Sequence, residues 1–177
     1  QMTIEHFVAQ CIGEWRSMRT GHSLAFQIFE DVTSEIRIKS VREDSDEVKD
    51  LLSLYEITSP PCSPFHMSWE ADSDWEPENS DEVSKGECLL IPIPTNASIG
   101  QLIRSVGYAE QERATANYEI LGDGTFILTT EYGQSIAEER IWFVSENVRC
   151  RSSVIKTSGG SGILQTSFAS EVRRVEL

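Results

Sequence analysis

The sequence has little positive charge and no long apolar run. Lys and Arg together number 15 against 29 Asp and Glu, which leaves a formal net charge of −14. That balance excludes a nucleic-acid binder, which needs a basic surface to neutralise phosphates, and argues against docking on an anionic membrane. No stretch reaches the roughly 18 apolar residues of a transmembrane helix, and the first residues lack the pattern of a signal peptide. We therefore expect a soluble protein that has neither nucleic acid nor membrane as a partner.

The sequence also lacks the motifs of common metal, nucleotide and hydrolase sites. Its four cysteines form no CxxC pair and its three histidines are scattered: Cys11, Cys62, Cys88, Cys150, His6, His22 and His66. This spacing predicts no zinc site and no dense disulfide framework, so we expect reduced structural thiols and no bound metal. There is no Ser-His-Asp pattern, no P-loop and no GxGxxG run.

Two short segments carry the apolar spacing of an amphipathic helix. In residues 3–12 the apolar side chains fall at i, i+3, i+4, i+7 and i+8, with Thr3 as a candidate N-cap and Gly13 as a stop. In residues 44–56 apolar side chains recur at helical spacing on an acidic background. The next stretch, 58–64, contains three prolines, so we expect a loop there.

The rest of the chain alternates in the manner of strands separated by turns. The expected strands are 14–26, 34–41, 65–75, 87–93, 101–109, 114–121, 125–132, 138–144, 148–156 and 164–175. Gly122-Asp123-Gly124 is the strongest hairpin signal between them. About ten antiparallel strands predict one all-β domain over residues 1–177, either a sandwich or a closed barrel. A barrel of that size would enclose room for a small ligand.

The tripeptide Gly13-Glu14-Trp15 directly follows the first expected helix and opens the first expected strand. In that place GxW resembles the lipocalin signature, in which the helix closes the base of the barrel and the Trp packs beneath it. An Arg from a late strand commonly stacks on that Trp, and Arg149 or Arg151 would supply such a cation–π contact here. We interpret Trp15 as a structural plug of the barrel base.

Four arginines within expected strands are candidates for anion recognition. Arg16 and Arg19 are three apart and should face opposite sides of a regular strand, whereas Arg149 and Arg151 are two apart and should share a face. Outward arginines would pair with acids on neighbouring strands. Inward arginines would bind a carboxylate through the guanidinium fork, so in a chain of this charge a cationic cavity would indicate an anionic ligand.

Aromatic and acidic side chains complete the set of candidates. Met67, Trp69 and Trp75 share one face of the strand expected over 65–75, where they form either an ordinary core or a wall for a flat conjugated ligand. Five carboxylates lie within expected strands: Glu70, Glu131, Glu138, Glu139 and Glu171. An inward carboxylate would exchange protons with a ligand nitrogen, but the spacing does not choose among the five.

Nine stretches spread over the whole chain resemble the S-type phycobiliprotein bilin lyases. They are WRSMRT at 15–20 (with His22 and 24–26), SEI at 34–36, MSWE at 67–70 (with Trp75), LIPIP at 90–94, GYAE at 107–110, LTTEY at 128–132, EERIWF at 138–143, NVRCRSS at 147–153 and SFASEVR at 167–173. Their order and their coverage carry the resemblance, since none of them is diagnostic alone.

The resemblance implies a ten-stranded antiparallel up-and-down β-barrel related to lipocalins and fatty-acid-binding proteins. It implies a lyase that binds a free linear tetrapyrrole, phycoerythrobilin or phycocyanobilin, without a built-in cofactor. The lyase would deliver this bilin to a cysteine of an apo-phycobiliprotein subunit, which forms a thioether with the ethylidene side chain of ring A. The expected location is the cyanobacterial cytoplasm or an algal plastid, and the resemblance leaves a homodimer open.

The resemblance also suggests roles for the candidate residues. Arg19, Arg149 and Arg151 would pair with the two propionates of the bilin, and Met67, Trp69 and Trp75 would pack on its rings. The carboxylates of Glu171 and Glu138 are the candidate catalytic groups, which would hold the bilin in a protonated and more electrophilic state. The alternative is a lipocalin-like carrier of another apolar anion, such as a fatty acid, without catalysis.

Overall fold

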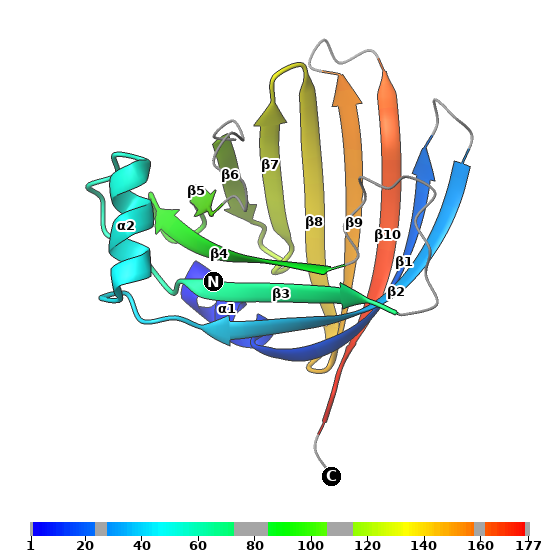
Figure 1. The fold of residues 1–177 in the computed structure, drawn as a ribbon, viewed down its shortest axis with the longest axis horizontal. Helices are drawn as coiled ribbons and strands as arrows, with labels where there is room; N and C mark the ends of the chain where they lie inside the picture. Colours follow the sequence, from blue (N-terminus) through cyan, green and yellow to red (C-terminus); the bar gives the residue numbers. More distant parts are fainter. Residues whose placement is uncertain (1, 24–27, 73–84, 106–114, 158–161, 176–177) are drawn as a thin grey trace.

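In the computed structural model, the chain folds into a closed barrel of antiparallel strands with two helices (Figure 1). The described residues are 2–23, 28–72, 85–105, 115–157 and 162–175. The strands are β1 Gly13–Ser23, β2 Ile28–Ser40, β3 Phe65–Ala71, β4 Lys85–Pro94, β5 Ile99–Arg104, β6 Thr115–Ile120, β7 Phe126–Tyr132, β8 Ser135–Ser145, β9 Val148–Thr157 and β10 Ile163–Arg173. The helices are α1 Ile4–Cys11 and α2 Asp46–Leu54. The predicted ten-stranded barrel and both predicted helices are confirmed.

Each strand pairs with its neighbours in sequence, and β1 closes the barrel by pairing with β10. The second strand begins at Ile28 rather than at the predicted residue 34, because residues 28–33 continue the ladder along β1 from Ser23 to Met18. Four predicted strand ends, 24–26, 73–75, 106–109 and 114, lie outside the described residues. The closed order means that alternate residues of every strand face a common interior.

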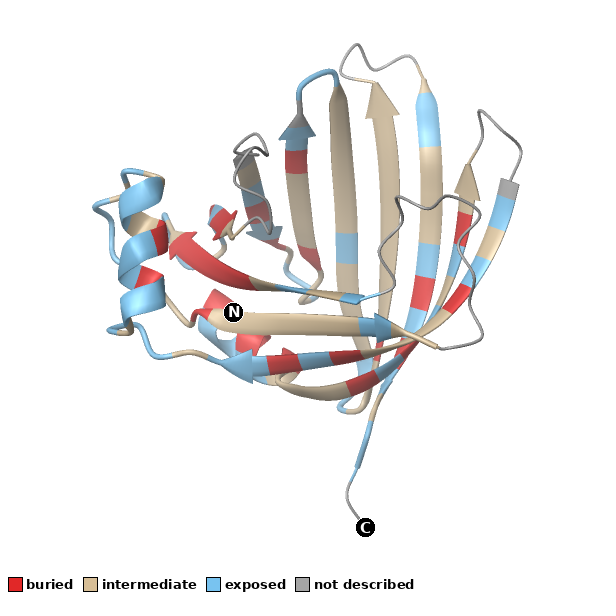
Figure 2. Cartoon of the chain, in the orientation of Figure 1, coloured by how far each residue is buried: buried red, intermediate tan, exposed pale blue. Residues whose placement is uncertain are grey.

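Helix α1 closes one end of the barrel. Thr3 caps it by accepting a hydrogen bond from the backbone N–H of His6 at 3.2 Å, as the sequence predicted. The apolar face of α1 packs into the interior, where Phe7 stacks on Phe126 with ring centroids 4.4 Å apart. Figure 2 shows the buried positions gathered at this end of the barrel. The end of the barrel that α1 closes is therefore filled with side chains, so space for a ligand is left only toward the other end.

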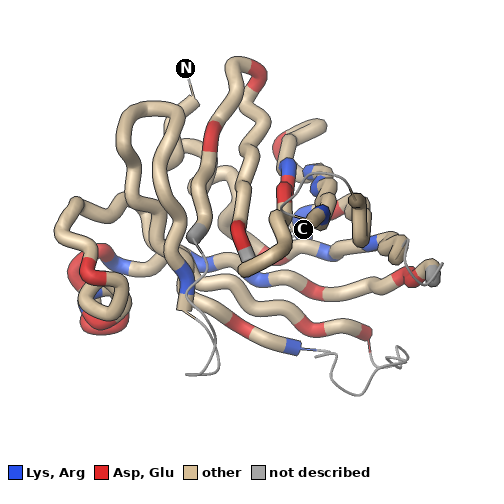
Figure 3. The backbone as a smooth tube through the Cα atoms, turned by 90° about the horizontal axis from the view of Figure 1, so that it is seen from above, with Lys and Arg blue, Asp and Glu red and all other residues tan. Residues whose placement is uncertain are grey.

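Helix α2 covers the outer surface of β4 and β5. Val48 and Leu51 pack there against Leu89, Ile91 and Ile103, which forms a second core outside the barrel. The stretch Leu89–Ile93 of β4 is consequently buried on both faces, which explains why it is a continuous apolar run instead of an alternating one. Acidic positions gather on α2 and the turn before it (Figure 3), so this part of the negative charge lies outside the barrel.

Candidate functional site

A cavity of about 400 Å³ occupies the half of the barrel that α1 does not fill. That volume lies within the range of roughly 300–1,000 Å³ found for small-molecule sites. Its lining comes from strands at the two ends of the sequence, β1 to β3 and β8 to β10. The closed sheet brings these strands together, so the cavity depends on barrel closure.

One wall of the cavity is apolar and aromatic. Val32 and Ile36 of β2 and Met67 and Trp69 of β3 supply it. Met67 and Trp69 share a face, as their spacing predicted, and this face lines the cavity. Trp75, the third member of the predicted set, lies outside the described residues.

A second wall, formed by β1, β9 and β10, is mostly polar and carries two arginines. Arg19 of β1 and Arg151 of β9 line it, together with Ser153, Gln165 and Ser167. Within the described part of the chain, Arg19 makes no ion pair and no side-chain hydrogen bond. A half-buried guanidinium without a partner is costly unless water or an anionic ligand solvates it. This wall is therefore suited to receive negative groups.

A buried ionic cluster supports the arginine wall from behind. The Nε of Arg149 donates a hydrogen bond to Oε1 of Glu171 at 2.7 Å, and the Nε of Arg151 lies 3.1 Å from the same oxygen. Glu171 is fully buried, and Arg149 is 3% exposed. Burial alone would raise the pKa of Glu171, but the charges of Arg151 and Arg149 and hydrogen bonding by Ser17 outweigh it and hold that pKa below its ordinary value. Glu171 is thus a charged anchor for both arginines.

Trp15 plugs the base of the barrel, as its position after α1 predicted. Its side chain is fully buried, and its indole N–H donates to the carbonyl of Cys11 at 2.9 Å. Arg149 lies over the ring at 4.8 Å, which selects it over Arg151 for the predicted cation–π contact. Arg173, which was not among the predicted residues, contacts the ring as well, at 4.5 Å. Its spacing of two from Glu171 was the available signal, because such residues share a face of a strand.

The structure corrects the placement of Glu138. It does not line the cavity; it pairs on the outer surface with Arg140, whose Nε donates to Oε1 of Glu138 at 3.0 Å. The adjacent Glu139 faces inward and lines the cavity instead. The reason is strand alternation, which places neighbouring residues on opposite faces of β8.

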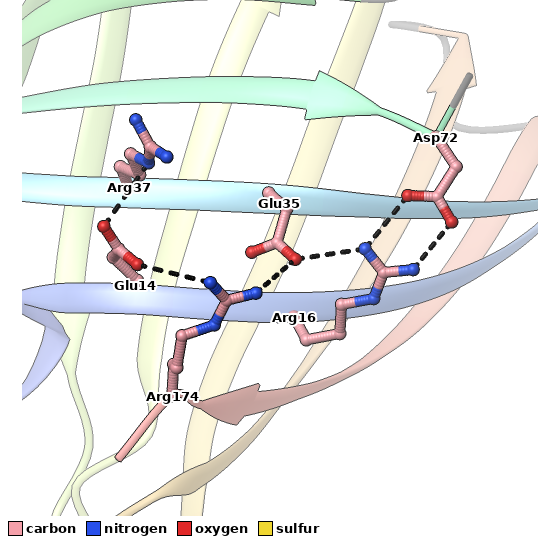
Figure 4. A network of polar contacts seen from close by, with 6 residues as sticks. All are labelled: Glu14, Arg16, Glu35, Arg37, Asp72 and Arg174. Atoms are coloured by element: carbon pink, nitrogen blue, oxygen red, sulfur yellow. Dashed lines mark hydrogen bonds and ion pairs between the residues drawn. The ribbon is translucent and has the colours of Figure 1, made fainter. Parts of the chain in front are cut away.

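Arg16 lies on the outer surface, opposite to Arg19, as the spacing predicted. It pairs with Glu35 at 3.1 Å and with Asp72 at 2.6 Å, and Arg174 joins the same network through Glu35 (Figure 4). Exposed arginines of this kind are already neutralised by acids. Arg19 of the cavity therefore differs from these outer arginines in its surroundings and not in residue type, whereas Arg151 is paired with the buried Glu171.

Other classes of site find little support in the described part of the chain. No three His, Cys, Asp or Glu side chains gather there in a manner suited to a metal ion. The four cysteines are free, and burial raises the pKa of the Cys11 thiol. Neither α1 nor α2 is long and apolar enough to cross a membrane.

A closed barrel with a plugged base and a cavity lined by apolar side chains and by two arginines is typical of one class, the small-molecule-binding β-barrel proteins. Within that class, residues 3–174 match the family model described as CpeS-like protein. The chain belongs to this family, and the resemblance found in the sequence is confirmed.

Relatives and a solved structure support the assignment. The chain is 49% identical over 175 residues to chromophore lyase CpcS/CpeS 3 of Trichodesmium erythraeum (strain IMS101), which covers 97% of this chain and 99% of that protein. It is 35% identical over 176 residues to chromophore lyase CpcS/CpeS of Thermosynechococcus vestitus (strain NIES-2133 / IAM M-273 / BP-1), covering 97% and 93%. The structure of the S-type phycobiliprotein lyase CPES from Guillardia theta superposes with a TM-score of 0.82 at 38% identity, covering 100% of this chain and 96% of that one.

Proposed function

We propose that this protein is a phycobiliprotein chromophore lyase, which holds a linear tetrapyrrole in its cavity and delivers it to a cysteine of an apo-phycobiliprotein subunit. The observation that carries the proposal is the cavity with Arg19 and Arg151 on one wall and Met67 and Trp69 on the other. A bilin has the same two-sided chemistry, since its conjugated rings are flat and apolar and its two propionates are anionic. The named activities of the relatives support the same class of substrate.

The two walls suggest how the bilin lies. Its rings pack against Met67 and Trp69, because a thioether and an indole adapt to a flat π-system. Its propionates point to Arg19 and Arg151, whose planar guanidinium groups match carboxylates in a bidentate manner. Arg149 is held behind Arg151 by Glu171, so we assign it to the support of the wall rather than to direct contact.

Glu139 is the carboxylate placed to meet the pyrrole nitrogens. It lines the cavity on β8, whereas Glu171 is fully buried against two arginines and is better suited to position them. A carboxylate beside the pyrrole nitrogens favours the protonated bilin, which makes the ethylidene carbon more electrophilic. The acceptor's thiolate then forms the C–S bond, the electron pair of the exocyclic double bond moves into the ring system, and a proton is taken up there. The lyase contributes orientation and protection.

The names of two relatives bear on which bilin is bound. A relative from Microchaete diplosiphon, 46% identical over 161 residues, carries the name of a phycoerythrobilin lyase. A relative from Picosynechococcus sp. (strain ATCC 27264 / PCC 7002 / PR-6), 27% identical over 170 residues, is named a phycocyanobilin lyase subunit. We propose phycoerythrobilin as the first substrate to test and phycocyanobilin as the second. We place the reaction in a cyanobacterial cytoplasm or an algal plastid, where the acceptor subunits are made.

The binding step is tested by two arginines on the same strand. The purified protein is titrated with each bilin, and binding is followed as a shift of the visible absorption band. Arg19→Ala should weaken binding by roughly tenfold or more, since it removes one charged hydrogen-bonding partner of a propionate. Arg16→Ala is the matched control, because it lies three residues away on the outer surface and should leave binding unchanged. Equal affinities of the two variants would contradict the proposed pose.

The transfer step is tested with an apo-phycobiliprotein subunit added to the bilin-loaded protein. We expect a covalent adduct that stays fluorescent in a denaturing gel under zinc enhancement. Glu139→Gln keeps the size of the side chain and removes its charge, so it should slow transfer more than it weakens binding. Binding of fatty acids with no spectral response to either bilin would instead support the carrier alternative.

A further inference from the structure

Gly86 of β4 lies directly opposite Trp69 of β3 in the sheet register. A Cβ atom placed on Gly86 would lie 2.9 Å from both Cε2 and Cη2 of the Trp69 indole, and closer still to its Cζ2. Real Cβ atoms do not approach other atoms this closely, so the six-membered ring of Trp69 occupies the space that any side chain at position 86 would need.

The backbone of Gly86 does not itself require glycine. Its φ lies outside the left-handed region, in contrast to Gly13 or Gly124, so another residue would adopt the same conformation without strain. Glycine inside a strand weakens the strand and commonly marks a close approach of another group. The three atoms nearest to a Cβ at this position all belong to the indole of Trp69. The absence of a side chain at position 86 is therefore explained by the space that the Trp69 indole needs, and not by the backbone conformation of the strand.

The position of this ring sets the shape of the cavity. Trp69 belongs to the apolar wall, and residues on its face of β3 and β4 point into the barrel. Because the indole lies back over Gly86, it leaves space in front of it toward Arg19 and Arg151. A methyl group at position 86 would grow from the same face and push the ring away from β4, into that space.

We propose that Gly86 is a specificity-determining positioning residue, which seats the Trp69 indole against β4 and so keeps the cavity wide enough for a flat, conjugated tetrapyrrole. This inference rests on the proposed function. Gly86 acts through Trp69 and does not touch the ligand. A smaller or more flexible ligand, such as an acyl chain, would be less sensitive to the same change because it fits around a displaced ring.

The first test compares two glycine substitutions in the full chain. Gly86→Ala should weaken bilin binding by roughly tenfold, since overpacking against a ring is relieved only by moving it. Gly122→Ala is the matched control, because a Cβ there meets nothing within 4 Å and its φ is ordinary. The same pair is made in a Trp69→Phe background, in which the outer part of the indole is absent. There Gly86→Ala should change affinity by less than about twofold.

The second test detects a change in the position of the Trp69 indole in the protein without ligand. In ¹H–¹⁵N spectra, the indole N–H signal of Trp69, assigned by its loss in Trp69→Phe, should shift in Gly86→Ala and stay in place in Gly122→Ala. Urea unfolding of each variant shows whether the fold is retained. If the wild-type protein binds no bilin, the proposed function fails, and the indole shift still decides whether Gly86 positions the ring. An unmoved indole signal, or an equal loss of affinity in both Trp69 backgrounds, would overturn the inference.

Discussion

The buried cluster of Glu171, Arg149 and Arg151 makes a quantitative prediction about stability. Glu171→Gln keeps the size of the side chain but removes the charge that faces two guanidinium groups. Removing one partner of a buried ion pair typically costs about 3–5 kcal/mol, because the other charge stays buried without compensation. Arg149 is 3% exposed and cannot turn to solvent, whereas Arg151 is 27% exposed and partly can. We therefore expect a loss of about 3 kcal/mol, at the lower end of that range.

The dependence of this loss on pH separates charge from packing. The pKa of Glu171 lies below its ordinary value of 4.5 in the folded protein. A depressed pKa means that the stabilisation is fully present above about pH 4.5 and is lost as the pH falls through the folded-state pKa. Wild type and Glu171→Gln should thus differ by the full amount at pH 7 and converge in acid.

The assay is urea unfolding followed by tryptophan fluorescence at a series of pH values. Glu138→Gln is the matched control, since Glu138 also pairs with an arginine but on the outer surface, where such pairs contribute about 0–1 kcal/mol. A gap of the same size at pH 7 and in acid would mean that the carboxylate's charge is not what stabilises the cluster. No gap at pH 7 would refute the reasoning altogether.

Two further predictions concern the cores. The Tyr118 hydroxyl is buried without a hydrogen-bond partner among the described residues, and burial, with a smaller contribution from Cys62, raises its pKa to about 12. Tyr118→Phe should therefore leave stability unchanged or raise it by up to about 1 kcal/mol, and a clear loss in urea unfolding would show a missing partner. Leu51→Ala in α2 should cost about 2–4 kcal/mol and leave bilin affinity unchanged, because its core lies outside the barrel. If Leu51→Ala also weakened bilin binding, the core under α2 and the barrel interior would be energetically coupled, contrary to this prediction.

The elements of the fold were predictable because each has a local pattern. The cap at Thr3, the helical spacing that follows it and the alternation of the later strands are all read over a few residues. The longer β2 was not predictable in the same way. Its first residues carry no clean alternation, and they are ordered as a strand by the ladder to β1.

The site was only half predictable, because spacing gives relative faces and not absolute ones. Arg149 and Arg151 were expected on one face and are found there. For β8 the spacing chose no face, and Glu138 was named as a candidate, whereas the neighbouring Glu139 lines the cavity. The sequence did hold a signal, since the face of Glu139 also carries Ile141, whereas Glu138 lies next to its partner Arg140 on the other face. Which face of β8 turns inward is decided when the sheet closes through β1 and β10, a contact between residues far apart in the sequence.

The pairing of β1 with β10 has a consequence for how the protein acquires its substrate. Until the last strand has left the ribosome, the barrel is an open sheet, and Trp15 lacks its contact with Arg173. The lining of the cavity combines residues of β1 to β3 with residues of β8 to β10, so the pocket is incomplete until the later strands have been added. Pairing β1 with β10 closes a loop that contains all the strands between them. Closing such a long loop costs chain entropy and is slow compared with the formation of local hairpins. Pigment that then enters stabilises the closed barrel by mass action and so delays its reopening.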